Sequence, residues 1–468
     1  MRYLLLLTLL LSSACSPLTP ITLEPPELPA SYLQQPPPNA ESLPDRWWQS
    51  FGDPQLNQLQ QQLLDGNLDL QQALYRLQQL AALQRASSAS LWPNLNFSAS
   101  LSRDKSAGSG NPNFATSERA SLAAGYEIDL WNRLHDKAAA AELRSAAGQL
   151  EVQTLLLSLS AQLTEQYFLA AEQRAQLRLI GGQIGHYRGL IETIGNRYRA
   201  GLAEARELYQ ARQNLARAEA LLPQYRTGLT RAENSIALLL GQLPQQQLTR
   251  IDTLPELTSA VDAGLPASLL TQRPDVTAAL TSLRAADREL AAALADRLPA
   301  INLSATAYYS ASQLARGDID GTFWTLALGL AQPLFDGGRR EAESDRQRAV
   351  RDEQLAGYQK TILNAVQEVE TALVTDQNSA ERQMWLQLQM QASQQELLHA
   401  HDNYRHGLLS SQDLLGSEIR YLEISSLNIA AQRQWLSNRI SLARALGGDW
   451  MASELAQQQQ TLSDKRDK

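Results

Sequence analysis

Two long runs without proline constrain the fold of this chain more than any other feature of its sequence. They cover residues 132–200 and 337–406. At about 1.5 Å of rise per residue, roughly 65 helical residues would extend about 100 Å. A helix of that length is far outside the usual range for a compact domain and is typical of long antiparallel hairpins packed as coiled coils. Each run ends in the sequence Tyr-Arg-x-Gly-Leu, at 198–202 and 404–408, and a second long helical pattern follows it.

Two segments of alternating polarity precede each long run. A period of two residues is typical of a strand with one apolar and one polar face. The apolar faces consist of Leu95, Phe97, Ala99 and Leu101; Leu122, Ala124, Tyr126, Ile128 and Leu130; Ile301, Leu303, Ala305, Ala307 and Tyr309; and Trp324, Leu326, Leu328 and Leu330. The order strand, strand, helix, helix therefore occurs twice, about two hundred residues apart, which predicts an internal duplication.

The strands raise a question of closure. Each has about ten residues, which is enough to cross a bilayer at a tilt. A sheet in lipid must close on itself, and four strands are too few, because the smallest bacterial barrels have about eight. Two interpretations remain: a soluble, half-buried sheet, or one barrel that several chains build together. Helices too long for a globule and a secretory signal favour the shared barrel.

That signal lies at the start of the chain. Arg2 is followed by an apolar run at 4–11 and by small residues at 12–14, the composition of a signal peptide. Its apolar run is too short to span a bilayer, and no other segment approaches the ~20 apolar residues of a membrane helix. The sequence therefore predicts a secreted protein.

Cys15, the single cysteine of the chain, follows directly and excludes an intramolecular disulfide. Its position resembles the lipobox of bacterial lipoproteins, in which the thiol receives a diacylglycerol. Ser12 stands where that motif prefers Leu, and Leu11 is displaced by one residue. Ser16 resembles the residue after the cysteine in lipoproteins that are released to the outer membrane. The alternatives are a lipid anchor on Cys15 or a secreted protein whose signal contains a chance cysteine.

A proline-rich stretch separates the signal from the folded part. Residues 16–44 are expected to form an extended tether or a strap over the folded body. Trp47 and Trp48 mark its end, since adjacent tryptophans bury large areas when they dock. Asp53 and Pro54 predict the N-cap and the first residue of a helix.

Together these features resemble the TolC family of outer-membrane efflux proteins, in the lipoprotein branch that serves tripartite pumps. The resemblance rests on Trp47-Trp48 with Phe51-Gly52-Asp53-Pro54-Gln55-Leu56, on Arg273-Pro274-Asp275-Val276, on Pro333-Leu334-Phe335-Asp336-Gly337-Gly338, and on the two Tyr-Arg-x-Gly-Leu sequences. It implies a homotrimer with a twelve-stranded β-barrel joined to an α-helical periplasmic tunnel. It also implies a mixed α/β belt built from residues before Leu91, residues 241–275 and the C-terminal tail.

The expected organisation follows from the repeats. It comprises a signal peptide at 1–14; a lipidated cysteine and tether at 15–46; a first repeat at 47–250, with strands at about 94–103 and 119–130 and helices at about 132–240; a second repeat at 251–450, with strands at about 300–310 and 322–333 and helices at about 337–446; and a polar tail at 451–468. The tail is expected to be disordered from Gln457 onward.

The resemblance also implies two sites. Gly201-Leu202 and Gly407-Leu408 match the hairpin tips, where family members meet a periplasmic membrane-fusion adaptor, and glycine also suits a reversal between helices. Asp413, six residues after Gly407, matches the acidic position that rings the closed tunnel entrance; a three-fold ring of carboxylates would favour cations. Gly416 stands where relatives often repeat the acid. The alternative for Asp413 is a solvated carboxylate in the first turn of a helix.

Other site classes find no support in the sequence. His399, His401 and His406 cluster, but the first two fall on different faces of a helix, and we interpret all three as surface residues rather than metal ligands. The chain lacks a phosphate loop, a Gly-x-Ser-x-Gly sequence and a paired-Cys motif, so no catalytic residue is predicted. A net charge of −8 argues against nucleic acid. No cofactor is predicted apart from the covalent lipid on Cys15.

The predicted function is the outer-membrane exit duct of a tripartite efflux system, which passively conducts drugs or other small molecules and is no enzyme. The expected partners are two further copies of the chain, a periplasmic adaptor, an inner-membrane pump and outer-membrane lipid. The expected location is the bacterial outer membrane, with extension into the periplasm. The alternative is a periplasmic or surface coiled-coil lipoprotein scaffold without a pore. The sequence names neither the exported substrates nor the pump class.

Overall fold

The computed structural model describes residues 28–34, 40–106, 113–245, 247–257, 260–314 and 317–466. Cys15, with the predicted signal peptide, lies outside the described residues. The chain divides into two compact units. Their described parts fall within Arg76–Gln149 and Ala278–Lys360 for the first unit, and within Glu27–Tyr75, Leu150–Thr277 and Thr361–Lys468 for the second.

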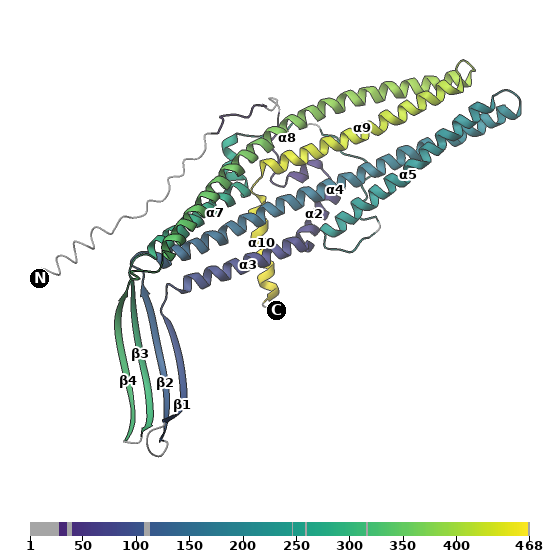
Figure 1. Cartoon of the computed structure of the whole chain (residues 1–468). Helices are drawn as coiled ribbons and strands as arrows, with labels where there is room; N and C mark the ends of the chain where they lie inside the picture. Colours follow the sequence, from purple (N-terminus) through teal and green to yellow (C-terminus); the bar gives the residue numbers. More distant parts are fainter. Residues whose placement is uncertain are drawn as a thin grey trace. The chain divides into compact units, whose positions relative to one another are not determined.

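The predicted order of elements recurs in both halves of the chain (Figure 1). The strands are β1 (Asn94–Ser106), β2 (Asn113–Ile128), β3 (Ala300–Leu314) and β4 (Gly317–Ala331), and the long helices are α4 (Arg133–Arg199), α5 (Ala205–Leu239), α8 (Arg339–Arg405) and α9 (Ser411–Leu446). The strands reach further into their hairpin loops than the sequence suggests. Antiparallel pairing continues there through polar residues such as Asp104, which lies opposite Ala115.

In the first unit, the described strands form one antiparallel sheet in the order β1-β2-β3-β4 (Figure 1). The central pair, β2 with β3, joins the two repeats. Within the described part of the chain, β1 and β4 each pair on one side only. Each outer strand therefore leaves a row of backbone N–H and C=O groups without a strand partner, which is untenable in lipid unless further strands pair with it.

The register of the sheet places the four predicted apolar faces on one side. Phe97 lies opposite Leu122, Leu122 opposite Ala307, and Ala307 opposite Trp324. The large side chains of this face are exposed apart from the half-buried Ile301, and Trp324 is 78% exposed. The opposite face carries polar side chains that include Ser98, Ser121, Asn302, Thr306 and Thr325. A continuous exposed apolar face of this kind indicates contact with an apolar phase or another protein surface.

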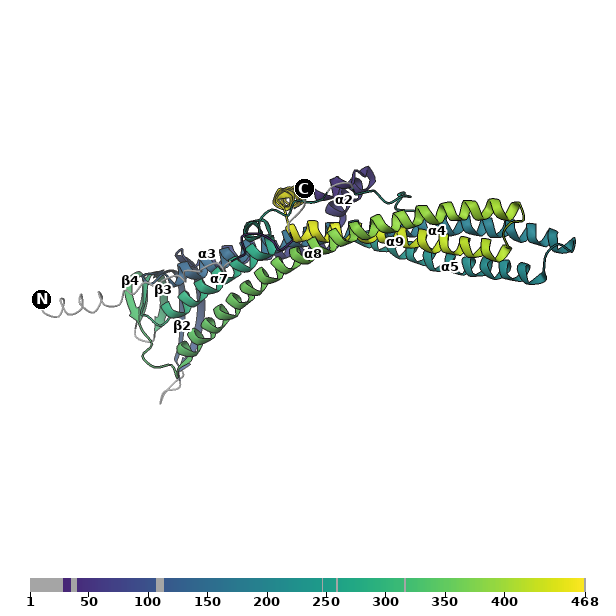
Figure 2. The same ribbon diagram turned by 90° about the horizontal axis from the view of Figure 1, so that it is seen from above.

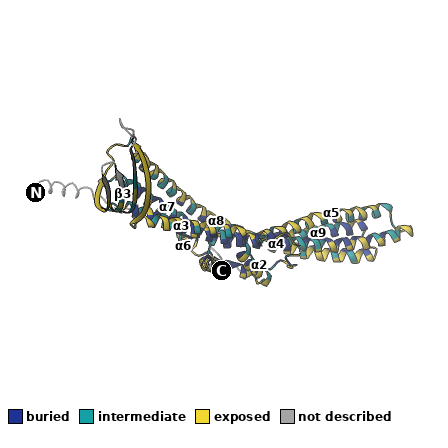
Figure 3. Ribbon diagram, turned by 90° about the horizontal axis from the view of Figure 1, so that it is seen from below, coloured by how far each residue is buried: buried dark blue, intermediate teal, exposed yellow. Residues whose placement is uncertain are grey.

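In the second unit, the parts of α4 and α8 that lie within it form two antiparallel hairpins with α5 and α9, and these hairpins run side by side (Figures 1 and 2). A core of buried side chains fills the space between them, and Figure 3 shows the buried residues on the facing sides of the helices. Its members are Ile180, Ile184, Tyr187, Leu190, Ile194, Ala211, Ala218, Ala400, Tyr404, Leu414 and Leu415. We call the contact between the two hairpins the seam. None of the described helices has the length and apolar composition to cross a membrane.

The N-cap at Asp53 is confirmed, and it belongs to the packed part of the second unit. The Asp53 carboxylate accepts the backbone N–H groups of Gln55 and Leu56 at 2.8 and 3.3 Å and so caps α2 (Pro54–Gly66). The buried hydroxyl of Tyr167 donates to the same carboxylate at 2.6 Å. One acid therefore fixes the start of a short helix and its position on a long one.

The mixed α/β belt contains less strand than predicted. Its segments form η1 (Trp47–Phe51), α2, α3 (Leu68–Ala89) and the short helices η2 (Pro266–Ser268) and α6 (Leu269–Gln272), and α7 (Pro274–Ala295) begins where they end. Outside the sheet, the described residues contain one isolated parallel bridge, between Glu41 and Val261. Prolines 244, 255 and 266 interrupt this region and lack the N–H that a longer ladder needs.

The prediction of a disordered tail is wrong, because Trp450–Arg466 forms helix α10. Trp450 and Leu455 are each 4% exposed. The ring of Trp450 packs edge-on against Trp48, with 4.8 Å between the ring centroids. These anchors fix the first turns, and glutamine, a good helix former, continues the helix beyond Gln457.

Candidate functional site

The two hairpin tips have the same backbone conformation. Gly201 and Gly407 adopt φ angles of 77° and 75°. Each turn contains the same two backbone hydrogen bonds. In the first turn, the Leu202 N–H donates to the Arg197 carbonyl at 2.8 Å and the Gly201 N–H donates to the Tyr198 carbonyl at 2.9 Å. In the second turn, the Leu408 N–H donates to the Asn403 carbonyl at 2.8 Å and the Gly407 N–H donates to the Tyr404 carbonyl at 3.0 Å. This is a Schellman pair of bonds, which needs a left-handed residue that glycine adopts without strain. The repeated Tyr-Arg-x-Gly-Leu sequence therefore encodes one turn that the chain uses twice.

Each turn presents a leucine to solvent. Leu202 is 69% exposed and Leu408 is 76% exposed. A Cβ atom added to either glycine would have no neighbour within 4 Å, so both turns are open as well as sharp. The structure thus places all four predicted tip residues at the ends of the hairpins.

Asp413 lies in the first turn of α9, whose N-cap is Ser410. The Asp413 N–H donates to Ser410 Oγ at 3.2 Å, and the Ser410 hydroxyl donates to the Asp413 carboxylate at 2.6 Å. The carboxylate therefore has the local role of the alternative interpretation, an acid at the positive end of a helix. It is also exposed, as an acid contributed to a ring by several chains would have to be.

A side-chain bridge between the two tips was not predicted. The Glu207 carboxylate accepts the Ser411 hydroxyl at 2.6 Å and the backbone N–H of Glu204 at 3.2 Å. Because α5 and α9 begin beside these residues, one carboxylate ties together the first turns of both. The sequence signals only the local half of this arrangement, an acid three residues after an N-cap. Ser411 is 204 positions away and leaves no such signal.

Farther along the seam lies a buried acid that sequence reasoning also missed. Glu418 is 1% exposed. The Gln183 amide donates to its Oε2 atom at 3.1 Å, and Nε2 of His401 lies 3.4 Å from Oε1. Burial raises the pKa of Glu418 to about 7. Burial, followed by the charges of His186 and Arg405, lowers the pKa of His401.

The interpretation of His401 as a surface residue is therefore wrong, because its side chain is 32% exposed and pairs with Glu418. Helical spacing alone could not reveal this, since the partner belongs to the next helix. No group of His, Cys, Asp and Glu side chains in the described part of the chain is arranged to hold a metal ion.

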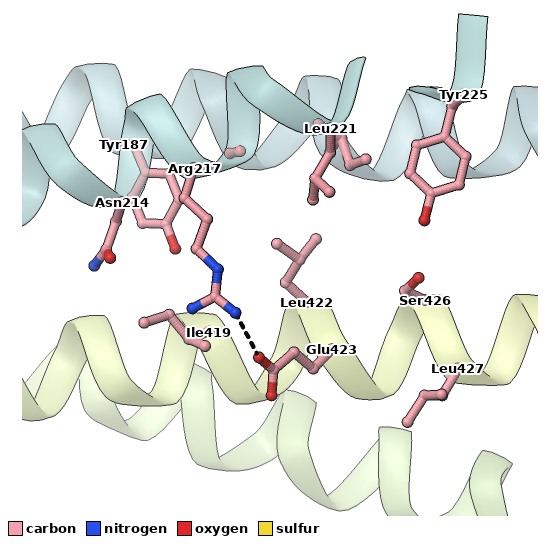
Figure 4. A pocket seen from close by; sticks show the side chains of 12 residues that line it. Tyr187, Asn214, Arg217, Leu221, Tyr225, Ile419, Leu422, Glu423, Ser426 and Leu427 are labelled. Carbon is pink, nitrogen blue, oxygen red and sulfur yellow. Dashed lines mark hydrogen bonds and ion pairs between the residues drawn. The ribbon is translucent and has the colours of Figure 1, made fainter. Parts of the chain in front are cut away.

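A cavity of about 360 Å³ lies in the same seam (Figure 4). Tyr187, Leu221 and Tyr225 line it from one hairpin, and Ile419, Leu422 and Leu427 line it from the other. Arg217 and Glu423 form an ion pair across it at 3.4 Å, the dashed line in Figure 4. Their side chains are 67% and 56% exposed, so solvent weakens the attraction. The seam is therefore packed around its buried core and hollow beneath this pair.

These features define a class of protein. The sheet has an exposed apolar face and two edges that other copies of the chain can extend. Two long hairpins end in matched, exposed turns with an acid beside one of them. A secreted chain with this combination belongs to the oligomeric export channels of the outer membrane rather than to monomeric scaffolds.

Comparison with known proteins identifies the family. The sequence profile of the outer membrane efflux proteins matches residues 59–242 and 265–448, and the chain belongs to this family. It is 31% identical over 464 residues to the pyoverdine export outer membrane protein OpmQ of Pseudomonas putida, and the alignment covers 96% of this chain and 98% of OpmQ. It is 28% identical over 419 residues to the cation efflux system protein CusC of Escherichia coli O6:H1, and the alignment covers 86% of this chain and 88% of CusC. Among solved structures, the outer-membrane channel OprN superposes with a TM-score of 0.83 at 26% identity, over 92% of this chain and 100% of OprN.

Family membership confirms the predicted fold class, function, partners and location. The chain is an outer-membrane efflux channel of the tripartite type. It acts in the outer membrane and extends into the periplasm, as a homotrimer that works with a periplasmic adaptor and an inner-membrane pump. Three copies of the four-stranded sheet supply the twelve strands of the barrel, which explains the open edges of β1 and β4. The scaffold without a pore finds no support.

Proposed function

We propose that the two hairpin tips and Asp413 form the periplasmic entrance of this channel. Leu202 and Leu408 would contact the adaptor, and Asp413 would control permeation. The observation that carries the proposal is the pair of open turns with the same conformation, each with a leucine that is largely exposed. Exposed apolar side chains at matched positions suit the groove of a helical partner.

The proposal for Asp413 is tested by separating its charge from its role in the helix cap. Asp413→Asn keeps an oxygen that can accept the Ser410 hydroxyl, whereas Asp413→Ala removes both charge and acceptor. We expect both variants to raise single-channel conductance in planar bilayers and to admit small charged antibiotics in cells, and Asp413→Glu to behave like the parent. If Asp413→Ala raises permeation and Asp413→Asn does not, Asp413 acts only in capping the helix and does not control permeation.

The tip proposal has its own test. Leu202→Asp and Leu408→Asp place a charge where an apolar contact is expected, so adaptor capture by the purified channel should fall and pump-dependent resistance should be lost. Leu243→Asp is a matched control, because Leu243 is 84% exposed in a loop away from both tips. Equal capture by all three variants would contradict an adaptor contact at the tips.

We further propose that the chain carries a covalent lipid on Cys15 and has no catalytic activity. The sequence around Cys15 supports the first statement, and membership of a family of transport channels supports the second. Mass spectrometry of the mature N-terminus tests the lipid: an unmodified Cys15, or cleavage elsewhere, would contradict it.

The exported cargo is set, in our proposal, by the pump rather than by this chain. Relatives of comparable identity are named for pyoverdine export and for cation efflux. Because the chain is similar to both, the similarity does not indicate which cargo it exports. Pairing the channel with pumps of different specificity should change what the cell exports, while channel variants outside the entrance should not.

A further inference from the structure

We propose that Glu418 and His401 share one proton that keeps Glu418 uncharged in the seam between the two hairpins, and that the seam loosens when this proton is lost at alkaline pH. The device lies inside one chain, on the buried side of the seam, and it does not depend on the entrance role proposed for Asp413. It would make the packing of the hairpins respond to the proton concentration of the periplasm.

The geometry suits one proton and no more. With a proton on Glu418 Oε1, that hydroxyl can donate to His401 Nε2 across the observed 3.4 Å, while Oε2 accepts the Gln183 amide at 3.1 Å. Both carboxyl oxygens of Glu418 then have a polar neighbour, and the net charge of the group is zero. Loss of the proton leaves a carboxylate charge in a site that is 1% exposed, where a charge without a cationic partner is costly.

Among the described residues, no arginine or lysine is paired with Glu418 in a way that would compensate its charge once the proton is lost. The charges that act on His401 are those of His186, Arg405 and Asp402, and Arg217 and Glu423 act on the neighbouring Tyr187. Arg420, two residues beyond Glu418 on α9, is bonded to Glu396 of α8. Arg217 is already paired with Glu423 at the surface, and Arg405 acts on His401, whose pKa it lowers. Ionisation of Glu418 therefore remains uncompensated.

Because Glu418 lies between the two hairpins, its charge favours their separation. Glu418 projects from α9, its partner Gln183 from α4 of the other hairpin, and His401 from α8. Leu414 and Leu415, which precede Glu418 on the same helix, belong to the apolar core of the seam. The cavity begins with the next residue, Ile419. Water can thus reach an ionised Glu418 by a small separation of α9 from α4, because that side of the seam is already hollow.

The direction of the effect follows from the pKa values. Glu418 has a raised pKa of about 7 in the packed seam, against 4.5 for an ordinary glutamate. Its contribution to packing is therefore fully present in acid and is lost as the pH rises through 7. If Glu418 regains an ordinary pKa when the hairpins separate, linkage gives an increase of about tenfold in the separated-to-packed ratio between about pH 6 and about pH 8. His401 acts in the opposite sense, since its lowered pKa penalises the packed seam once the pH falls below the ordinary value of 6.5, so tenfold is the upper limit of the increase over this range.

The test uses the purified full-length trimer and hydrogen–deuterium exchange of residues 411–422, corrected for the chemical exchange rate at each pH. The opening constant of this segment should rise by up to about tenfold between about pH 6 and about pH 8, and single-channel open probability should rise with it. Glu418→Gln, neutral at every pH and similar in shape, should abolish the dependence. Asp413→Asn should keep it, which separates this device from the proposed entrance. The same pH dependence in Glu418→Gln, or none in the parent protein, would overturn the proposal.

A second measurement covers the case in which Glu418→Gln does not assemble. Infrared difference spectra of the parent trimer should show a protonated carboxyl group that ionises over the same pH range. Gln183→Leu removes a donor that favours the ionised form, so this titration should move to higher pH. A parent trimer without such a carboxyl signal would refute the shared proton directly.

Discussion

The same small substitution should have opposite effects at two glycines of the helical hairpins. Gly407 adopts a φ of 75° at the tip between α8 and α9, whereas Gly189 lies in the interior of α4 with ordinary helical geometry. Neither position offers a Cβ atom any neighbour within 4 Å. Replacement by alanine therefore changes only the preference of the backbone, without adding a clash or filling a cavity.

The magnitudes follow from conformation alone. A left-handed residue with a Cβ atom costs about 1–2 kcal/mol, so Gly407→Ala should raise the opening constant of its turn about 5- to 30-fold. Alanine is favoured over glycine inside a helix by about 0.8–1 kcal/mol, so Gly189→Ala should lower the opening constant of its own segment several-fold. Hydrogen–deuterium exchange of residues 404–412 and 185–193 measures both effects. Unchanged exchange at 404–412 in Gly407→Ala, or faster exchange at 185–193 in Gly189→Ala, would refute the reasoning.

Two further predictions concern the sheet and the second unit. Leu326→Arg places a charge on the apolar face of β4 and should cost about 2–4 kcal/mol, seen as loss of folded trimer from outer membranes; Thr325→Arg, on the opposite face, should be tolerated. Arg439→Met breaks a bidentate pair with Asp376 whose two contacts are both 3.0 Å, and whose side chains are 7% and 11% exposed. The unpaired acid should lower stability by about 3–5 kcal/mol, and the double variant with Asp376→Leu should recover most of the loss in thermal unfolding.

The sequence predicts features whose cause is local. The alternation in residues 95–101 and 324–330 defines the strand faces because a period of two residues leaves each face unmixed. The hairpin tips are predictable because a left-handed turn needs glycine, and Asp53 because an N-cap needs a short acceptor. Contacts between distant segments have no such signature. Gln183 and Glu418 are separated by 235 positions, and neither residue type reveals its partner.

The C-terminal tail shows that the average polarity of a segment can give a wrong prediction of its structure. Its composition beyond Gln457 is polar, and polarity predicts disorder. The decisive residue lies earlier: Trp450 docks on Trp48 from the opposite end of the chain. Once that ring is fixed, the following residues need only avoid breaking a helix, which glutamine does well.

The links between the two hairpins differ along the seam in a way that suits an entrance that must open. Beyond the Glu207–Ser411 bridge at the tips, the next links include Arg217 with Glu423, an exposed pair above a cavity, and such a pair contributes at most about 1 kcal/mol. Farther from the tips, Glu165 of α4 accepts Arg433 of α9 at 3.2 Å and Ser437 at 2.5 Å, with both charged side chains 23% exposed. Bonds to a charged group that water reaches poorly are stronger than exposed ones. The polar links are therefore weaker around the cavity than farther along the seam. Glu418, which precedes Glu423 on α9, lies between the tip bridge and this weak stretch, so loss of its proton would extend the weak stretch toward the tips.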